Sequence, residues 1–176
     1  ETRTPKAVIR DPILDALPTY DTSLIITASS LMSTVVFIYI VIENESTHSL
    51  VYTASHLLCV FYMISLIRMV CIILCPLKQH AAGILLRDHF IRYIAGESMS
   101  TRHDLMFSGH MAQQVFYLCY TPQYETFFLV MSIQSALALL LGKIHYTIDI
   151  IVGWCVTHYI CDMFPLAEYK MSDGLD

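Results

Sequence analysis

Charged residues are scarce in this sequence. Lysine, arginine, aspartate and glutamate together supply 14% of its 176 residues, whereas hydrophobic residues supply 56%. Soluble domains carry about 25% charged residues. The low share of charged residues and the high share of hydrophobic residues exclude an ordinary soluble domain. The low arginine content excludes a nucleic-acid-binding surface, because such a surface needs clustered cations. A chain of this length is expected to form one domain, with lipid as the solvent around most of it.

Patterns for metal binding and for a phosphate-binding glycine loop are also missing. The six cysteines form no CxxC pair and lie in or beside apolar runs, as buried reduced thiols do: Cys59, Cys71, Cys75, Cys119, Cys155 and Cys161. Several histidines show no partner pattern: His48, His56, His80, His89 and His158. We therefore expect no metal and no cofactor.

Long apolar runs are abundant, and they predict an all-α, polytopic membrane helix bundle. The first run, residues 23–42, covers as a helix about 30 Å, the thickness of a bilayer core. Together with the later runs it predicts about five transmembrane helices, at residues 23–42, 51–75, 107–120, 127–141 and 144–164. The mixed segment 81–95 predicts a short interfacial amphipathic helix. We expect a surface arm over residues 1–22, a membrane domain over 23–165 and a tail over 166–176.

Two polar segments lie at the N-terminal ends of the third and the fifth expected spans. The first contains Asp104, Ser108, Gly109 and His110, and the second runs from Lys143 to Asp149. The chain between them crosses the membrane and returns. Both segments should therefore reach the same membrane face. Most lysines and arginines lie on that face, which the positive-inside rule places in the cytosol or its equivalent.

The residue types in these segments suit phosphoryl chemistry. His145 and Asp149 are four residues apart and share a helix face. A carboxylate on one ring nitrogen leaves the other nitrogen basic, as a nucleophile requires. Ser108 and Gly109 stand where a helix begins, and its free N–H groups favour a phosphate oxygen. Each pattern alone is often structural, but two such segments at one depth in lipid predict a functional site, since ionisable groups are costly there.

Arg68 is a single charge within the second expected span. A charge inside a membrane helix is costly and often functional. The alternative is that its side chain snorkels to the interface, because it lies about two turns from the end of the span. The sequence leaves both interpretations open.

The two motifs, Asp104-x-x-x-Ser108-Gly109-His110 and His145-Tyr-Thr-Ile-Asp149, resemble those of the sphingomyelin synthases and related ceramide phosphotransferases. These enzymes belong to the type 2 phosphatidic acid phosphatase superfamily. The arm from Asp11 to Pro18 is similar to the segment before that family's second span. Arg68 falls where the family has an arginine.

The resemblance implies a role for each residue. His145 would attack phosphorus and form a phosphohistidine, with Asp149 orienting it, and His110 would act as general acid and base. Phosphate or substrate would be bound by Ser108, Gly109, Asp104, Arg68 and Tyr146. The implied partners are a phospholipid donor, a lipid alcohol acceptor and the bilayer. An endomembrane or the plasma membrane is the implied location, with the mitochondrial inner membrane as the alternative for a complex subunit.

The motifs depart from those of the phosphatase branch, which has a Lys/Arg pair in its first motif and an arginine ahead of the last histidine. Residues 136–142 hold no arginine, and Lys143 is the nearest cation. A phosphomonoester dianion needs several charge-assisted hydrogen-bond donors. The small number of lysines and arginines near the motifs therefore favours a phosphodiester substrate, such as phosphatidylcholine or phosphatidylethanolamine, as the head-group donor. Two alternatives stay open: a hydrolase with the same site, and a non-catalytic lipid-binding subunit of a membrane complex. Whether the chain forms a homo-oligomer also stays open.

Overall fold

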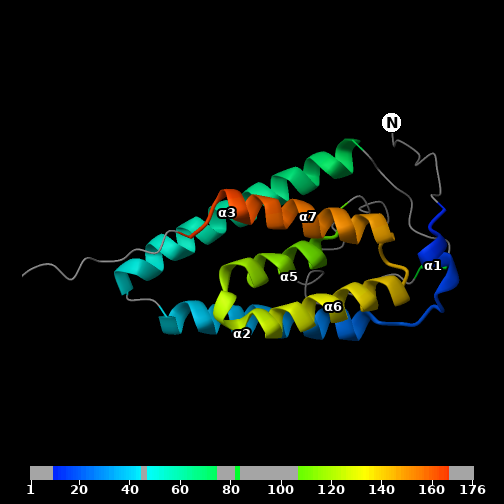
Figure 1. Ribbon diagram of the computed structural model, residues 1–176, viewed down its shortest axis with the longest axis horizontal. Helices are drawn as coiled ribbons and strands as arrows, with labels where there is room; N and C mark the ends of the chain where they lie inside the picture. Colours follow the sequence, from blue (N-terminus) through cyan, green and yellow to red (C-terminus); the bar gives the residue numbers. More distant parts are fainter. Residues whose placement is uncertain (1–9, 45–46, 75–81, 84–106, 167–176) are drawn as a thin grey trace, which may run out of the picture.

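The computed structural model describes residues 10–44, 47–74, 82–83 and 107–166 (Figure 1). Within these ranges all regular structure is helical, which confirms the expected all-α class. The elements in chain order are α1 (Pro12–Ala16), α2 (Ser23–Asn44), α3 (Thr47–Leu74), α5 (Gly109–Tyr120), the 3-10 turn η2 (Pro122–Tyr124), α6 (Glu125–Leu141) and α7 (Thr147–Met163).

The long helices coincide with the apolar runs of the sequence. Three of them contain segments long and apolar enough to cross a bilayer: Ser23–Glu43, Leu50–Leu74 and Pro122–Leu141. Helix α2 has 22 residues, or about 33 Å at 1.5 Å per residue. Helices α5 and α7 have 12 and 17 residues and are shorter than a full span. The interfacial helix expected at 81–95 lies almost entirely outside the described residues.

Large apolar side chains cover the outer surface of α2 and α3. Leu24 is 81% exposed, and Leu58 and Val51 are each 68% exposed. Soluble monomers rarely show continuous apolar surface on this scale. These exposed apolar faces suit contact with lipid hydrocarbon. Together with the three candidate spans, they indicate a membrane protein.

Helix α5 lies at the centre of the bundle, between α6 and α7 (Figure 1). Helix α2 packs beside α5 and α6, while α3 packs mainly on α7. The core between α2 and α5 is aromatic, with the rings of Phe37 and Tyr117 stacked at a centroid distance of 4.4 Å. Offset stacking of this kind adds to the burial of apolar area.

Polar side chains also join the helices. The Ser30 hydroxyl donates to Gln113 Oε1 at 2.7 Å, and Gln113 Nε2 donates to the Thr34 hydroxyl at 2.8 Å, which links α2 to α5. Gln134 Nε2 donates to Ser29 at 2.8 Å and links α6 to α2. Such hydrogen bonds hold helices together in lipid, where apolar burial gives little preference between neighbours.

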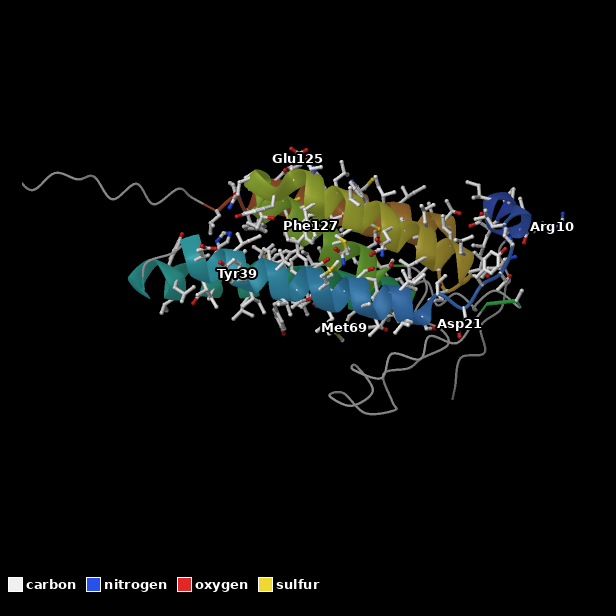
Figure 2. The ribbon with its side chains drawn as sticks, turned by 90° about the horizontal axis from the view of Figure 1, so that it is seen from below. Arg10, Asp21, Tyr39, Met69, Glu125 and Phe127 are labelled. Carbon is white, nitrogen blue, oxygen red and sulfur yellow. The ribbon has the colours of Figure 1, made fainter. Side chains whose placement is uncertain are left out.

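Helices α5 and α7 run in the same direction, and α6, which joins them in the chain, runs back along the other side of α5. Their N-termini therefore lie at one end of the bundle, the end where α1 lies in Figure 1. Arg10 and Asp21 are at this end in Figure 2, and Glu125 is at the other. The expectation that both polar segments reach one face agrees with this arrangement.

Candidate phosphoryl-transfer site

The N-termini of α5 and α7 are bonded to each other directly. The backbone N–H of Ser108 donates to the Asp149 carbonyl at 3.2 Å. Gly153, one turn further along α7, makes this approach possible, since a Cβ there would lie 3.0 Å from the Ser108 carbonyl oxygen. Glycine at a helix crossing allows two backbones to come this close. The two motifs therefore lie side by side at this end of the bundle.

His145 and Asp149 are a buried pair. Nδ1 of His145 lies 3.5 Å from Oδ2 of Asp149, and their side chains are 8% and 0% exposed. The same oxygen accepts the Tyr146 backbone N–H at 2.8 Å, which holds the carboxylate in place. With the carboxylate on the Nδ1 side, Nε2 is the ring nitrogen that could act as a base or a nucleophile.

The surroundings of His145 favour its neutral form. Burial lowers the pKa of the imidazole below its ordinary value of 6.5, although Asp149 raises it. Electrostatic interactions with His110, on α5, and with Arg68, on α3, lower the pKa further. A neutral imidazole at pH 7 has a lone pair available for attack on phosphorus.

Ser108 and Gly109 start helix α5. The Ser108 side chain caps the helix by accepting the Met111 N–H at 3.3 Å. No carbonyl of α5 can accept from the N–H groups of Gly109 and His110, because they lie in the first turn. These two amides and the positive end of the helix suit a phosphate oxygen. His110, in the same turn, is half-buried.

Arg68 lies against the start of α5. A Cβ added at Gly109 would be 3.0 Å from Arg68 Nη1 and 3.1 Å from its Cζ, so the guanidinium fits where glycine has no side chain. The side chain is partly buried. This position beside the first turn of α5 favours the functional interpretation of Arg68 over snorkelling.

The other two predicted binding residues differ. The Tyr146 side chain is 1% exposed and packs against Leu14 and Leu140, on the arm and the end of α6. Its binding role stays a prediction. Asp104 lies outside the described residues.

Some features of the site end were not predicted. Asp11 and Thr147 are hydrogen-bonded to each other across 136 residues of chain. No local sequence pattern predicts such a contact. Gly153 could have been found, because a glycine inside a membrane helix is typical of close helix packing.

The expectation that His158 has no partner was wrong. His158 Nδ1 lies 3.0 Å from Asp162 Oδ2, with the same four-residue spacing as His145 and Asp149. Within the described ranges no group of three or more His, Cys, Asp or Glu residues could hold a metal ion.

Residues 103–166 match the family model of the PAP2 superfamily C-terminal domain. The matched segment contains His110, His145 and Asp149. No curated protein and no solved structure matches the chain. The match supports the PAP2 superfamily and, in general terms, a lipid enzyme of the phosphatase or phosphotransferase type. It does not single out the sphingomyelin synthases.

Proposed function

We propose that this chain is a lipid phosphotransferase that moves a phospho head group from a glycerophospholipid to a ceramide-like alcohol. The observation that carries the proposal is the buried His145–Asp149 pair, bonded through its backbone to the helix start that bears His110. The family match over this segment supports phosphoryl chemistry on lipids in general. Transfer to an alcohol, as opposed to hydrolysis by water, is part of our proposal.

In the first step Nε2 of His145 attacks the phosphorus of the donor diester. The bond between phosphorus and the diacylglycerol oxygen breaks, and protonated His110 gives its proton to that oxygen. The products are diacylglycerol and a phosphohistidine that carries the head group. The Asp149 carboxylate would stabilise the positive charge that His145 acquires.

In the second step the acceptor hydroxyl replaces the histidine. His110, now neutral, takes the hydroxyl proton while the oxygen attacks phosphorus. The bond between Nε2 and phosphorus breaks, and His145 returns to its neutral form. His110 is protonated again, so the site is ready for the next donor.

The phosphate would be held by the first turn of α5 and by Arg68. The N–H groups of Gly109 and His110 would bind its oxygens, Ser108 would keep that turn in place, and the guanidinium beside Gly109 would supply a positive charge. A diester carries one negative charge, which this set can balance. We propose Asp104 and Tyr146 as further substrate contacts on the resemblance alone.

Hydrolysis is the second candidate, favoured by the match to a superfamily named for phosphatases. Water would then take the place of the acceptor hydroxyl in the second step. The same residues serve both reactions, so the difference lies in what reaches the phosphohistidine.

The test is a reconstitution of the purified chain in vesicles of head-group-labelled phosphatidylcholine, with and without ceramide. A transferase makes labelled sphingolipid and diacylglycerol only when ceramide is present. A hydrolase releases labelled phosphocholine in both cases. A protein that binds lipid without turnover is the non-catalytic subunit instead, and sphingolipid formed by the His145→Ala variant would contradict the mechanism.

A further inference from the structure

The arm ahead of α2 is bonded to both sides of the turn that carries His145. This turn, residues 142–146, joins α6 to α7 and is called here the His145 turn. The Thr22 hydroxyl donates to the Ala138 carbonyl at 2.6 Å, and the Tyr20 N–H donates to the Leu141 carbonyl at 2.9 Å. These two hydrogen bonds hold the arm to the end of α6. Figure 1 shows α1 at the same end of the bundle.

Asp11 carries the arm to the other side of the turn. Its Oδ2 accepts the backbone N–H of Thr147 at 2.7 Å, and its Oδ1 accepts the Thr147 hydroxyl at 3.1 Å. Oδ1 also accepts the Leu14 N–H at 3.1 Å. One carboxylate, 8% exposed, therefore caps two helices that are far apart in the sequence, α1 and α7.

The bond to Thr147 satisfies a group that its own helix cannot. Thr147 is the first residue of α7, so its N–H has no acceptor within the helix. A negative charge at this end also interacts favourably with the helix dipole. Burial raises the pKa of Asp11, but the hydrogen bonds from Thr147 and Leu14 outweigh this and lower it below the ordinary value of 3.8. The carboxylate is therefore charged at neutral pH.

An apolar contact accompanies these hydrogen bonds. Leu14, on α1, is 0% exposed and packs against Tyr146. The arm therefore contacts both Tyr146 and Thr147, which lie between His145 and Asp149 in the chain. Movement of these two residues would change the distance between the imidazole and the carboxylate.

The His145 turn contains a strained residue that needs such support. Lys143 has a φ of 48°, in the left-handed region that residues with a side chain rarely adopt. Strained conformations persist where the surrounding structure over-determines them. The arm does so by bonding Leu141 on one side of the turn and Thr147 on the other.

We propose that Asp11 is a positioning residue for catalysis: by holding Thr147 it fixes the start of α7 and keeps His145 aligned with Asp149. The inference rests on the proposed function, and extends it to a residue that touches neither substrate nor phosphate. Asp11 acts through the backbone of the second motif.

The test compares Asp11→Asn with wild type in the reconstituted assay. The variant leaves the Thr147 N–H and hydroxyl with one side-chain acceptor in place of two. We expect kcat to fall about 10-fold to 100-fold, the size of loss that a misplacement of up to about 1 Å causes, with KM little changed. Glu125→Gln is the matched control, an exposed carboxylate at the opposite end of the bundle (Figure 2), and should retain wild-type kcat.

Two variants of Thr147 cover the case in which Asp11→Asn fails to fold. Thr147→Val removes only the hydroxyl donor and should lower kcat by a few-fold. Thr147→Ser keeps the donor and should restore wild-type kcat. Equal kcat in all the variants, or a loss confined to KM, would overturn the positioning role.

A readout independent of turnover separates this inference from the proposed function. Selective ¹⁵N labelling of histidine in detergent gives the titration of His145, and hydrogen exchange gives the protection of the Thr147 amide. In Asp11→Asn we expect faster exchange at Thr147 and a lower His145 pKa, because Asp149 moves away. If wild type shows no turnover but these shifts occur, the function fails and the positioning stands. If neither shift occurs, Asp11 does not position His145.

Discussion

Two His–Asp pairs, one at each end of α7, share their spacing and differ in almost everything else. His145 and Asp149 are 3.5 Å apart with side chains 8% and 0% exposed. His158 and Asp162 are closer, at 3.0 Å, but their side chains are 50% and 66% exposed. By contact distance alone the second pair would be the better candidate.

The two pairs differ most in what surrounds them. Around the first pair lie the start of α5, with His110, and the guanidinium of Arg68. Burial excludes water there and strengthens each electrostatic interaction. The side chains of the second pair are largely exposed. An exposed ion pair contributes little to stability.

Removal of the histidines should give the largest contrast. His145→Ala loses the nucleophile, so we expect product formation to fall by about 10³-fold or more. His158→Ala should stay within about twofold of wild type, as exposed substitutions usually do. Initial rates in vesicles and trapping of ³²P-labelled protein measure both. Similar losses in the two variants would remove the basis of the comparison.

Neutralising the carboxylates should give the next largest contrast. Asp149→Asn keeps the shape but loses the charge that orients His145, and we expect kcat to fall about 10²-fold to 10⁴-fold. Asp162→Asn is the matched control and should leave kcat unchanged. Phosphohistidine formation in a single turnover locates the defect in the first step. If that step is normal in Asp149→Asn, the carboxylate does not serve the nucleophile.

Substitution of Arg68 tests how much this neighbour of the His145–Asp149 pair contributes to activity. Arg68→Lys keeps the charge but loses the planar group that lies over Gly109, and we expect kcat/KM for the diester donor to fall about tenfold. Arg10→Gln, an exposed arginine at the same end of the bundle (Figure 2), is the control. Lipid-dependent rates measure both. An effect of equal size in Arg10→Gln would indicate a general surface-charge effect.

The pH profile should show the smallest effect. His145 must be neutral to attack, and burial lowers its pKa below 6.5. Activity is therefore retained below pH 6.5 and is lost as the pH falls through the lowered pKa. Asp149 raises that pKa, while His110 and Arg68 lower it, so the acid limb should move to still lower pH in Asp149→Asn. An acid limb at or above pH 6.5 in wild type would contradict this assignment.

Local patterns were enough to predict much of the fold and part of the site. The apolar runs predicted helices α2, α3, α5, α6 and α7, and three segments of the described residues are long and apolar enough to cross a bilayer. A bilayer demands length and hydrophobicity of every span. Counting the helices placed the two motifs at one end. The spacing of His145 and Asp149 predicted their contact, since residues four apart share a helix face.

The same reasoning did not predict other contacts. The five residues of α1 are too few to form a stable helix alone, so contacts such as that of Leu14 with Tyr146 support it. Arg68 could have snorkelled, and its place beside Gly109 depends on how α3 crosses α5. The four-residue spacing of His158 and Asp162 is present in the sequence and would have predicted their contact.

Composition and spacing alone were sufficient for the membrane helices, their order and the contact of His145 with Asp149, because these follow from interactions within a few turns of helix. The packing of distant segments was needed to bury one pair and expose the other, and to bring Asp11 to Thr147 across 136 residues. Burial and long-range hydrogen bonds depend on which helices become neighbours, and no local stretch of sequence contains that information.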